Sequence, residues 1–205
     1  GPETAEEGDP RARYLTEITD VAKRSCDLVA KALRSGALPV VLGGDHSLSI
    51  GTVPAVAAHC AETEESLGLI WVDAHTDMNT PETSPSGNVH GMPLACLCGI
   101  GPRPLTHLYG YAPKVNPANV VLLGIRDVDL TERPIVRQSG VTAFTMRDID
   151  ERGMRAVMQE AINVASLGTA GIHLSLDMDG VDPREAPGVG TPVRGGFSYR
   201  EAHLA

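Results

Sequence analysis

Three short segments rich in aspartate and histidine contain the residues of this sequence that are best suited to chemistry. They are Gly43-Gly44-Asp45-His46, Asp73-Ala74-His75-Thr76-Asp77 and Asp177-Met178-Asp179-Gly180-Val181-Asp182. Each segment follows a short apolar run that is typical of a buried strand. Ligands of open parallel sheets bind at the carboxyl ends of the strands, so we predict that the three segments form one binding site.

The residue types in these segments favour a pair of metal ions. If the backbone stays extended, Asp73, His75 and Asp77 point to one side, and Asp177 and Asp179 do the same. Carboxylates packed together repel one another, and two divalent cations remove that repulsion. Carboxylates with two imidazoles and no thiolate favour a hard or borderline ion such as Mn²⁺ over a structural zinc. Each segment alone could be a turn, because Asp and Gly favour turns, but three such segments at three strand ends indicate a metal site.

The apolar runs and the helical stretches between them predict the fold. Buried strands are expected at residues 38–42, 69–72, 120–125, 141–144 and 172–176. Helical spacing of apolar residues occurs at residues 14–33, 47–61, 93–98, 131–139 and 146–165. Strands that alternate with helices need crossover connections, which predict a mostly parallel sheet covered on both faces, a three-layer α/β/α arrangement. We expect one α/β domain at residues 11–205 after a flexible, acidic lead-in at residues 1–10.

Composition narrows the classes of partner. The chain has 205 residues and a formal net charge of −9, which argues against nucleic acid because phosphate binding needs a basic surface. We find no apolar run long enough to span a membrane, no leader and no lipidation signal, so we expect no membrane partner and a cytoplasmic location. The 4 cysteines form no CxxC pair and are expected to be reduced thiols.

Taken together, the segments at residues 43–47, 73–77 and 175–183 resemble the three signatures of the ureohydrolase family, and within it those of the arginases. The likeness extends from about Pro39 to the C-terminus. It implies an arginase/deacetylase-like α/β fold that is incomplete in this chain. It also implies hydrolysis of L-arginine to L-ornithine and urea, in which a hydroxide bridging two Mn²⁺ ions attacks the guanidinium carbon. Members of the family are typically homo-oligomers.

The resemblance implies roles for individual residues of the metal centre. The six metal ligands would be His46, Asp73, His75, Asp77, Asp177 and Asp179, with Asp73 and Asp177 shared by both ions. Asp45 would orient the imidazole of His46, as residues next to metal ligands often do. His90 matches the histidine that passes a proton to the leaving amine, a task that suits an imidazole because it titrates near neutral pH. Asp77 is also expected to be catalytic.

The resemblance extends to the groups that bind the substrate. The matching contacts are Asn79, Ser86 and Asn88 for the substrate carboxylate, Asp129 with Glu132 for the α-amino group, and Thr191 for the guanidinium end. A charge-assisted bond from Asp129 to the ammonium favours α-amino acids.

The chain also departs from the family pattern. Family members continue beyond the segment that matches residues 197–201, with a glutamate that pairs with the guanidinium, and they begin with a strand that has no counterpart here. We therefore expect exposed sheet edges and weak or absent turnover. One alternative is another ureohydrolase, such as an agmatinase or a guanidino-acid hydrolase, against which Ser86-Gly87-Asn88 and Asp129 argue. The other is a non-catalytic metal-binding or interaction protein, which the early end of the chain favours.

Overall fold

The structure, a computed structural model, describes residues 7–205, and the chain divides into two compact units. Unit 1 contains the residues up to Ser66 together with Asp77–Val115, and unit 2 contains Leu67–Thr76 and Asn116–Ala205. The first part of the predicted lead-in, residues 1–6, lies outside the described residues. In its remaining part, the carbonyl of Glu7 accepts a hydrogen bond from the backbone N–H of Tyr14.

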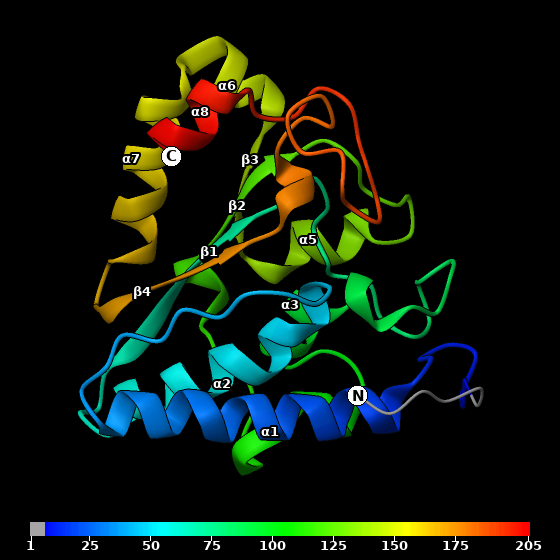
Figure 1. Ribbon diagram of the computed structural model, residues 1–205, viewed down its shortest axis with the longest axis vertical. Helices are drawn as coiled ribbons and strands as arrows, with labels where there is room; N and C mark the ends of the chain where they lie inside the picture. The colour runs from blue at the N-terminus through cyan, green and yellow to red at the C-terminus, as the bar shows by residue number, and fades with distance from the viewer. Residues whose placement is uncertain (1–6) are drawn as a thin grey trace. The chain divides into compact units, whose positions relative to one another are not determined.

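Unit 1 is built from helices. Its α-helices are α1 (Leu15–Arg34), α2 (Ser49–Ala61), α3 (Pro93–Leu97) and α4 (Arg103–Thr106), and its 3-10 helices are η1 (His46–Leu48), η2 (Val89–Gly91) and η3 (Leu108–Gly110). Helices α1 and α2 pack side by side (Figure 1). The buried face of α1 includes Ala22, Cys26 and Val29, which recur at helical spacing. The helix predicted over residues 14–33 is therefore confirmed.

The strand predicted over residues 38–42 is wrong. The segment has no regular secondary structure, and Leu38 and Leu42 are 88% and 89% exposed. A strand is stable only when its backbone groups pair with a neighbouring strand. Within the described residues this segment pairs with none, so its apolar side chains stay in contact with solvent.

Unit 1 also buries a lysine. The Lys114 side chain lies with its Nζ 4.0 Å from the ring centroid of Tyr111. The same nitrogen donates hydrogen bonds to the carbonyl of Thr106, at 3.1 Å, and to the carbonyl of Tyr111. Burial lowers the pKa of Lys114 from 10.5 to about 8, because the ammonium loses contact with water.

This lowered pKa predicts a pH-dependent stability. Between pH 8 and 10.5 the unfolded chain binds a proton that the folded Lys114 has released, so the free energy of unfolding should rise with pH in that window. Replacing Lys114 with Met should remove a rise on the order of 2 kcal/mol. Urea unfolding at several pH values measures it, with Lys31→Met on the exposed face of α1 as the control. Equal pH slopes in the native chain and in the Lys114→Met variant would contradict the prediction.

Unit 2 is organised around a four-stranded sheet in the order β3-β2-β1-β4. The strands are β1 (Ser66–Val72), β2 (Val120–Ile125), β3 (Thr142–Thr145) and β4 (Thr169–Leu176). The β1–β2 and β2–β3 pairs are parallel, with Val72 opposite Leu123. Strand β2 is buried throughout, whereas in β4 four of the eight residues are exposed and only Ser175 is buried. The prediction of a buried strand at residues 172–176 is thus wrong as to burial, because β4 is an edge strand with a single neighbour.

The helices of unit 2 connect and cover these strands. They are α5 (Arg133–Ser139), α6 (Met146–Arg152), α7 (Met154–Ala165) and α8 (Tyr199–Leu204), with the 3-10 helices η4 (Pro117–Asn119) and η5 (Met178–Gly180). The single helix predicted over residues 146–165 is divided at Gly153, whose φ of 81° breaks the helix. Helix α7 lies beside the sheet (Figure 1). Its Val157 and Ala161 pack with Ile70 and Val121 of the sheet in one apolar core. The predicted α/β class with a parallel sheet is confirmed.

Residues 7–205 contain no helix with both the length and the apolar character needed to cross a membrane.

Candidate metal centre

The first functional segment bends immediately after β1. Asp73 is 1% exposed, and its carboxylate is held on both sides. Its Oδ1 accepts a hydrogen bond of 2.7 Å from the backbone N–H of His75, and its Oδ2 accepts one of 3.2 Å from Nε1 of Trp71. The expected strand-like alternation through residues 73–77 is wrong, because the chain bends from Asp73 onward and Asp77 has a φ of 51°.

The loop after β4 meets the loop after β1. The backbone N–H of Asp177 donates to the carbonyl of Val72 at 2.8 Å, which aligns the two strand ends. Asp179 lies in η5, where its backbone N–H donates to Oδ1 of Asp177 at 2.9 Å. The Oδ1 of Asp179 in turn accepts from the backbone N–H of Ala74 at 3.1 Å. This bond ties together two loops that are 105 residues apart in the sequence.

Three of the predicted metal ligands converge in unit 2. The Nδ1 atom of His75 lies 3.2 Å from Oδ1 of Asp73 and 3.1 Å from Oδ2 of Asp179. One ligand atom from each of these residues lies within 4.8 Å of the others. Both carboxylates are buried, whereas the His75 side chain is 27% exposed. Asp177 is not one of the three, although its Oδ1 supports the backbone of Asp179.

The charges of this cluster fit a divalent cation. Burial by itself lowers the pKa of His75, but the hydrogen bonds to Asp179 and Asp73 outweigh it and raise the pKa to about 11. The imidazolium thus offsets the charge of two buried carboxylates. Histidine binds a metal ion only as the neutral imidazole. A divalent ion that displaces the His75 proton therefore takes over the task of offsetting the two carboxylate charges. Two carboxylates and one ring nitrogen are suitable donors for a hard or borderline ion.

Unit 1 holds a second imidazole–carboxylate pair. The Nδ1 atom of His46 lies 3.3 Å from Oδ2 of Asp77, and both side chains are buried. His46 begins η1, which is capped by the carboxylate of Asp45 through the backbone N–H of Ser47 at 3.0 Å. The carbonyl of Asp77 accepts a hydrogen bond from the backbone N–H of Leu94 at 3.0 Å, which fixes Asp77 at the start of α3. The pair offers two more of the predicted ligand types.

The substrate-binding residues predicted in unit 1 lie in the loop that leads to η2. Asn79 is buried, and its Oδ1 accepts a hydrogen bond of 3.0 Å from the hydroxyl of Thr83. The hydroxyl of Ser86 accepts from the backbone N–H of Asn88 at 3.1 Å, so Ser86 also shapes the turn. His90 lies within η2 and is partly exposed.

The substrate-binding residues predicted in unit 2 lie after β2 and η5. Asp129 is exposed, whereas Glu132 is buried, and the carbonyl of Asp129 accepts from the backbone N–H of Glu132 at 3.1 Å. The hydroxyl of Thr191 donates to Oδ2 of Asp179 at 2.8 Å. Thr191 therefore helps to hold a predicted metal ligand, a contact that the sequence did not suggest.

Arg126 is a residue of the site that sequence reasoning missed. Its guanidinium donates to the carbonyls of Asp179 at 2.6 Å, Gly180 at 3.1 Å and Val193 at 2.7 Å. These bonds hold the loop that carries Asp179. Its position in the sequence could have indicated this role, because Arg126 directly follows the apolar run of β2. A charged residue at the carboxyl end of a central strand often belongs to a functional site.

Comparison with known proteins gives the same family throughout the chain. A profile of the Arginase family matches residues 3–205. The chain is 50% identical over 200 residues to the arginase of Bacillus caldovelox, and the alignment covers 98% of this chain and 66% of that protein. It is 49% identical over 197 residues to the arginase of Bacillus subtilis (strain 168), which covers 96% of this chain and 65% of that protein.

The solved structures agree. The native structure of arginase from Bacillus caldovelox at pH 5.6 superposes with a TM-score of 0.93 at 49% identity, and the match covers 99% of this chain and 67% of that one. The chain thus spans 66% and 65% of the lengths of the two curated relatives. Because the profile matches nearly every residue and the identity reaches 50%, this chain belongs to the arginase family.

Proposed function

We propose that this chain carries the metal ligands and most of the substrate contacts of an enzyme that hydrolyses L-arginine to L-ornithine and urea. The observation that carries the proposal is the imidazole of His75 between the buried carboxylates of Asp73 and Asp179. Such a cluster by itself fits many metalloproteins. Among the reactions of such proteins, the arginase relatives at about 50% identity favour arginine hydrolysis.

We assign the cofactor as two Mn²⁺ ions. The proposed ligands are His46, Asp73, His75, Asp77, Asp177 and Asp179. Divalent ions at such residues lower the pKa of a water molecule and stabilise charge that develops in the transition state. The hydrogen bonds from Trp71 to Asp73 and from Thr191 to Asp179 hold both carboxylates in place and would support them as ligands of the ions.

The remaining predicted residues recognise the substrate and move a proton. Asn79, Ser86 and Asn88 would donate neutral hydrogen bonds to the substrate carboxylate, and Asp129 would pair with the α-ammonium, helped by Glu132. His90 would pass a proton to the nitrogen of the leaving amine. Agmatine lacks the carboxylate, so the protein groups that donate hydrogen bonds to it would have no acceptor. The proposed site therefore favours arginine over agmatine.

Urea release from L-arginine and from agmatine in the presence of Mn²⁺ tests the proposal. We expect kcat/KM for arginine to exceed that for agmatine by about 100-fold. Asn88→Ala should lower kcat/KM for arginine by about tenfold, since one contact to the substrate carboxylate is lost, and should leave kcat/KM for agmatine unchanged. The ratio of the two should therefore fall by about tenfold. Asn163→Ala is a matched control, because Asn163 is an exposed amide on α7.

The same measurements separate the alternatives. Because we expect slow turnover, calorimetry of L-ornithine and putrescine binding to the Mn²⁺-loaded chain gives a second measure of carboxylate recognition. Preference for agmatine and putrescine would favour an agmatinase. Mn²⁺ binding without recognition of either product or hydrolysis of either substrate would favour a non-catalytic metal-binding protein.

A further inference from the structure

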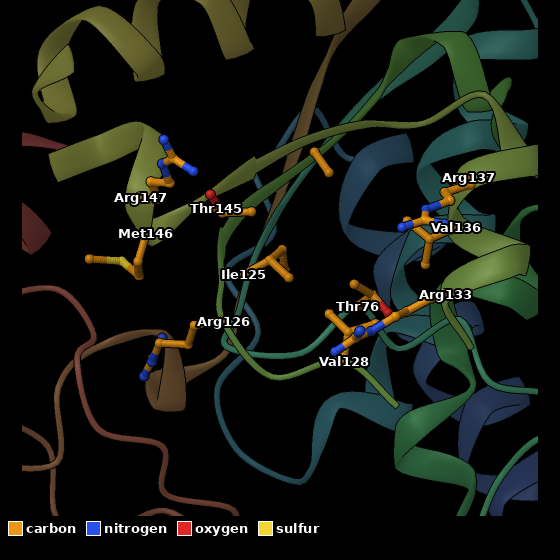
Figure 2. Close-up of a pocket in the computed structure, with 11 residues that line it drawn as sticks. Thr76, Ile125, Arg126, Val128, Arg133, Val136, Arg137, Thr145, Met146 and Arg147 are labelled. Carbon is orange, nitrogen blue, oxygen red and sulfur yellow. The ribbon is translucent and has the colours of Figure 1, made fainter. Parts of the chain in front are cut away.

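A pocket of about 520 Å³ opens in unit 2 at the ends of β2 and β3, between α5 and α6 (Figure 2). Its apolar lining consists of Ile125, Val128, Val136, Ala143 and Met146. A pocket of this size and character is suited to a small organic molecule. None of the proposed metal ligands lines it, so the inference drawn from it does not depend on arginine hydrolysis.

The polar part of the lining is strongly basic. Four arginines line the pocket: Arg126, Arg133, Arg137 and Arg147. The guanidinium of Arg126 is occupied by backbone carbonyls, and that of Arg147 pairs with Glu151 at 2.7 Å. Two of the four therefore already have partners of their own.

The other two, Arg133 and Arg137, lie one turn apart on α5. In the part of the chain that the structure describes, neither has a carboxylate within ion-pair distance. Like charges at this spacing on a helix repel, so an anion bound between them would be stabilised. Both side chains are exposed at the mouth of the pocket and are available to a ligand.

A buried hydroxyl points to the same ligand chemistry. Thr76 lines the pocket, is 1% exposed, and its Oγ1 has no hydrogen-bond partner within residues 7–205. A buried hydroxyl without a partner is unfavourable and rare. Figure 2 shows Thr76, Arg133 and Arg137 on one side of Ile125, with Arg147 on the other. The three side chains therefore lie on the same side of the pocket.

We propose that this pocket binds a small organic carboxylate. Its two oxygens accept hydrogen bonds from Arg133, Arg137 and the hydroxyl of Thr76, because the planar guanidinium matches a carboxylate well. Its apolar body contacts Ile125 and Met146. The apolar walls distinguish such a ligand from an inorganic anion, which would leave them in contact with water.

Calorimetry with sodium hexanoate tests the proposal, with hexanamide as a neutral probe of the same shape. We expect hexanoate to bind at one site and hexanamide to bind at least about tenfold more weakly. The double variant Arg133→Gln/Arg137→Gln should weaken hexanoate binding by about tenfold or more. Arg155→Gln, at an exposed position of α7 outside the pocket, should leave it unchanged. Circular dichroism confirms that each variant is folded.

Thr76→Val supplies an independent variant, since valine keeps the shape and removes only the hydroxyl. We expect it to weaken hexanoate binding by about threefold to tenfold. Equal affinities for hexanoate and hexanamide would mean that the pocket recognises only an apolar chain. Unchanged affinity in the double arginine variant, or no binding of hexanoate to the folded protein, would exclude an anion at these residues. Each of these results overturns the proposal.

Discussion

Replacing Asp179 with Asn should reduce the affinity of the chain for Mn²⁺ by at least about a hundredfold, more than the tenfold to hundredfold loss typical when a neighbour of a metal ligand is changed. The amide keeps the size of the side chain and its carbonyl can still accept the hydrogen bond from Ala74. It removes one of the two negative charges next to His75. With one carboxylate charge fewer, the site attracts a divalent ion more weakly.

Calorimetric titration with Mn²⁺ measures this loss, and Asp150→Asn is the matched control. Asp150 is an exposed aspartate on α6, so its replacement should leave the affinity unchanged. A second measurement needs no metal. NMR titration should find the pKa of His75 near 11 in the metal-free chain and clearly lower in the Asp179→Asn variant, since only Asp73 then stabilises the imidazolium. Unchanged Mn²⁺ affinity would exclude Asp179 as a ligand.

The second large effect is expected from Gly68→Ala, which should lower the free energy of unfolding by about 3 kcal/mol or more. Gly68 lies in β1 where α7 packs closely against the strand. A Cβ atom at this position would lie 2.0 Å from the carbonyl oxygen of Ala165, a backbone atom that cannot rotate away. Either α7 or β1 must shift, and both belong to the apolar core of unit 2.

Urea unfolding measures the loss, with Gly171→Ala as the control. Gly171 is also a strand glycine, in β4, but a Cβ atom there meets nothing within 4 Å. We expect the control to change the free energy of unfolding by less than about 0.5 kcal/mol. Equal destabilisation by the two substitutions would show that the cost arises from strand glycines in general and not from the contact between β1 and α7.

Much of the fold could be predicted because its elements are encoded locally. Helical spacing predicted α1, and continuous apolar runs predicted β1 and β2, whose side chains are buried in the structure. The rule that an apolar run forms a buried strand failed twice. Residues 38–42 form no strand, and β4 is a strand but is not buried. An apolar run indicates that a segment favours an extended, buried conformation, but burial and pairing depend on which neighbours the rest of the chain supplies.

Within the candidate site, residue types could be predicted and geometry could not. Aspartate and histidine after successive strands predicted Asp73, His75 and Asp179 as metal ligands, and the structure brings these three side chains together. The reason given for their convergence, an extended backbone with alternating side chains, does not hold, because the chain bends at Asp73 and Asp179 lies in η5. The supporting roles of Trp71, Thr191 and Arg126 were likewise not apparent, since each acts on a loop distant in sequence or through a local bend.

By itself, the sequence determined most of the helices and the central strands, the α/β class, and the chemistry of the acidic and imidazole groups, because these depend on residue type and local spacing. Only the tertiary structure decided that β4 lies beside β1, which brings Asp179 to His75, and that Thr76 and two arginines of α5 line one pocket. The physical reason is that strand order and loop bends arise from packing and hydrogen bonds between residues far apart in the sequence, such as the hydrogen bond that spans 105 positions, and no local pattern contains such contacts.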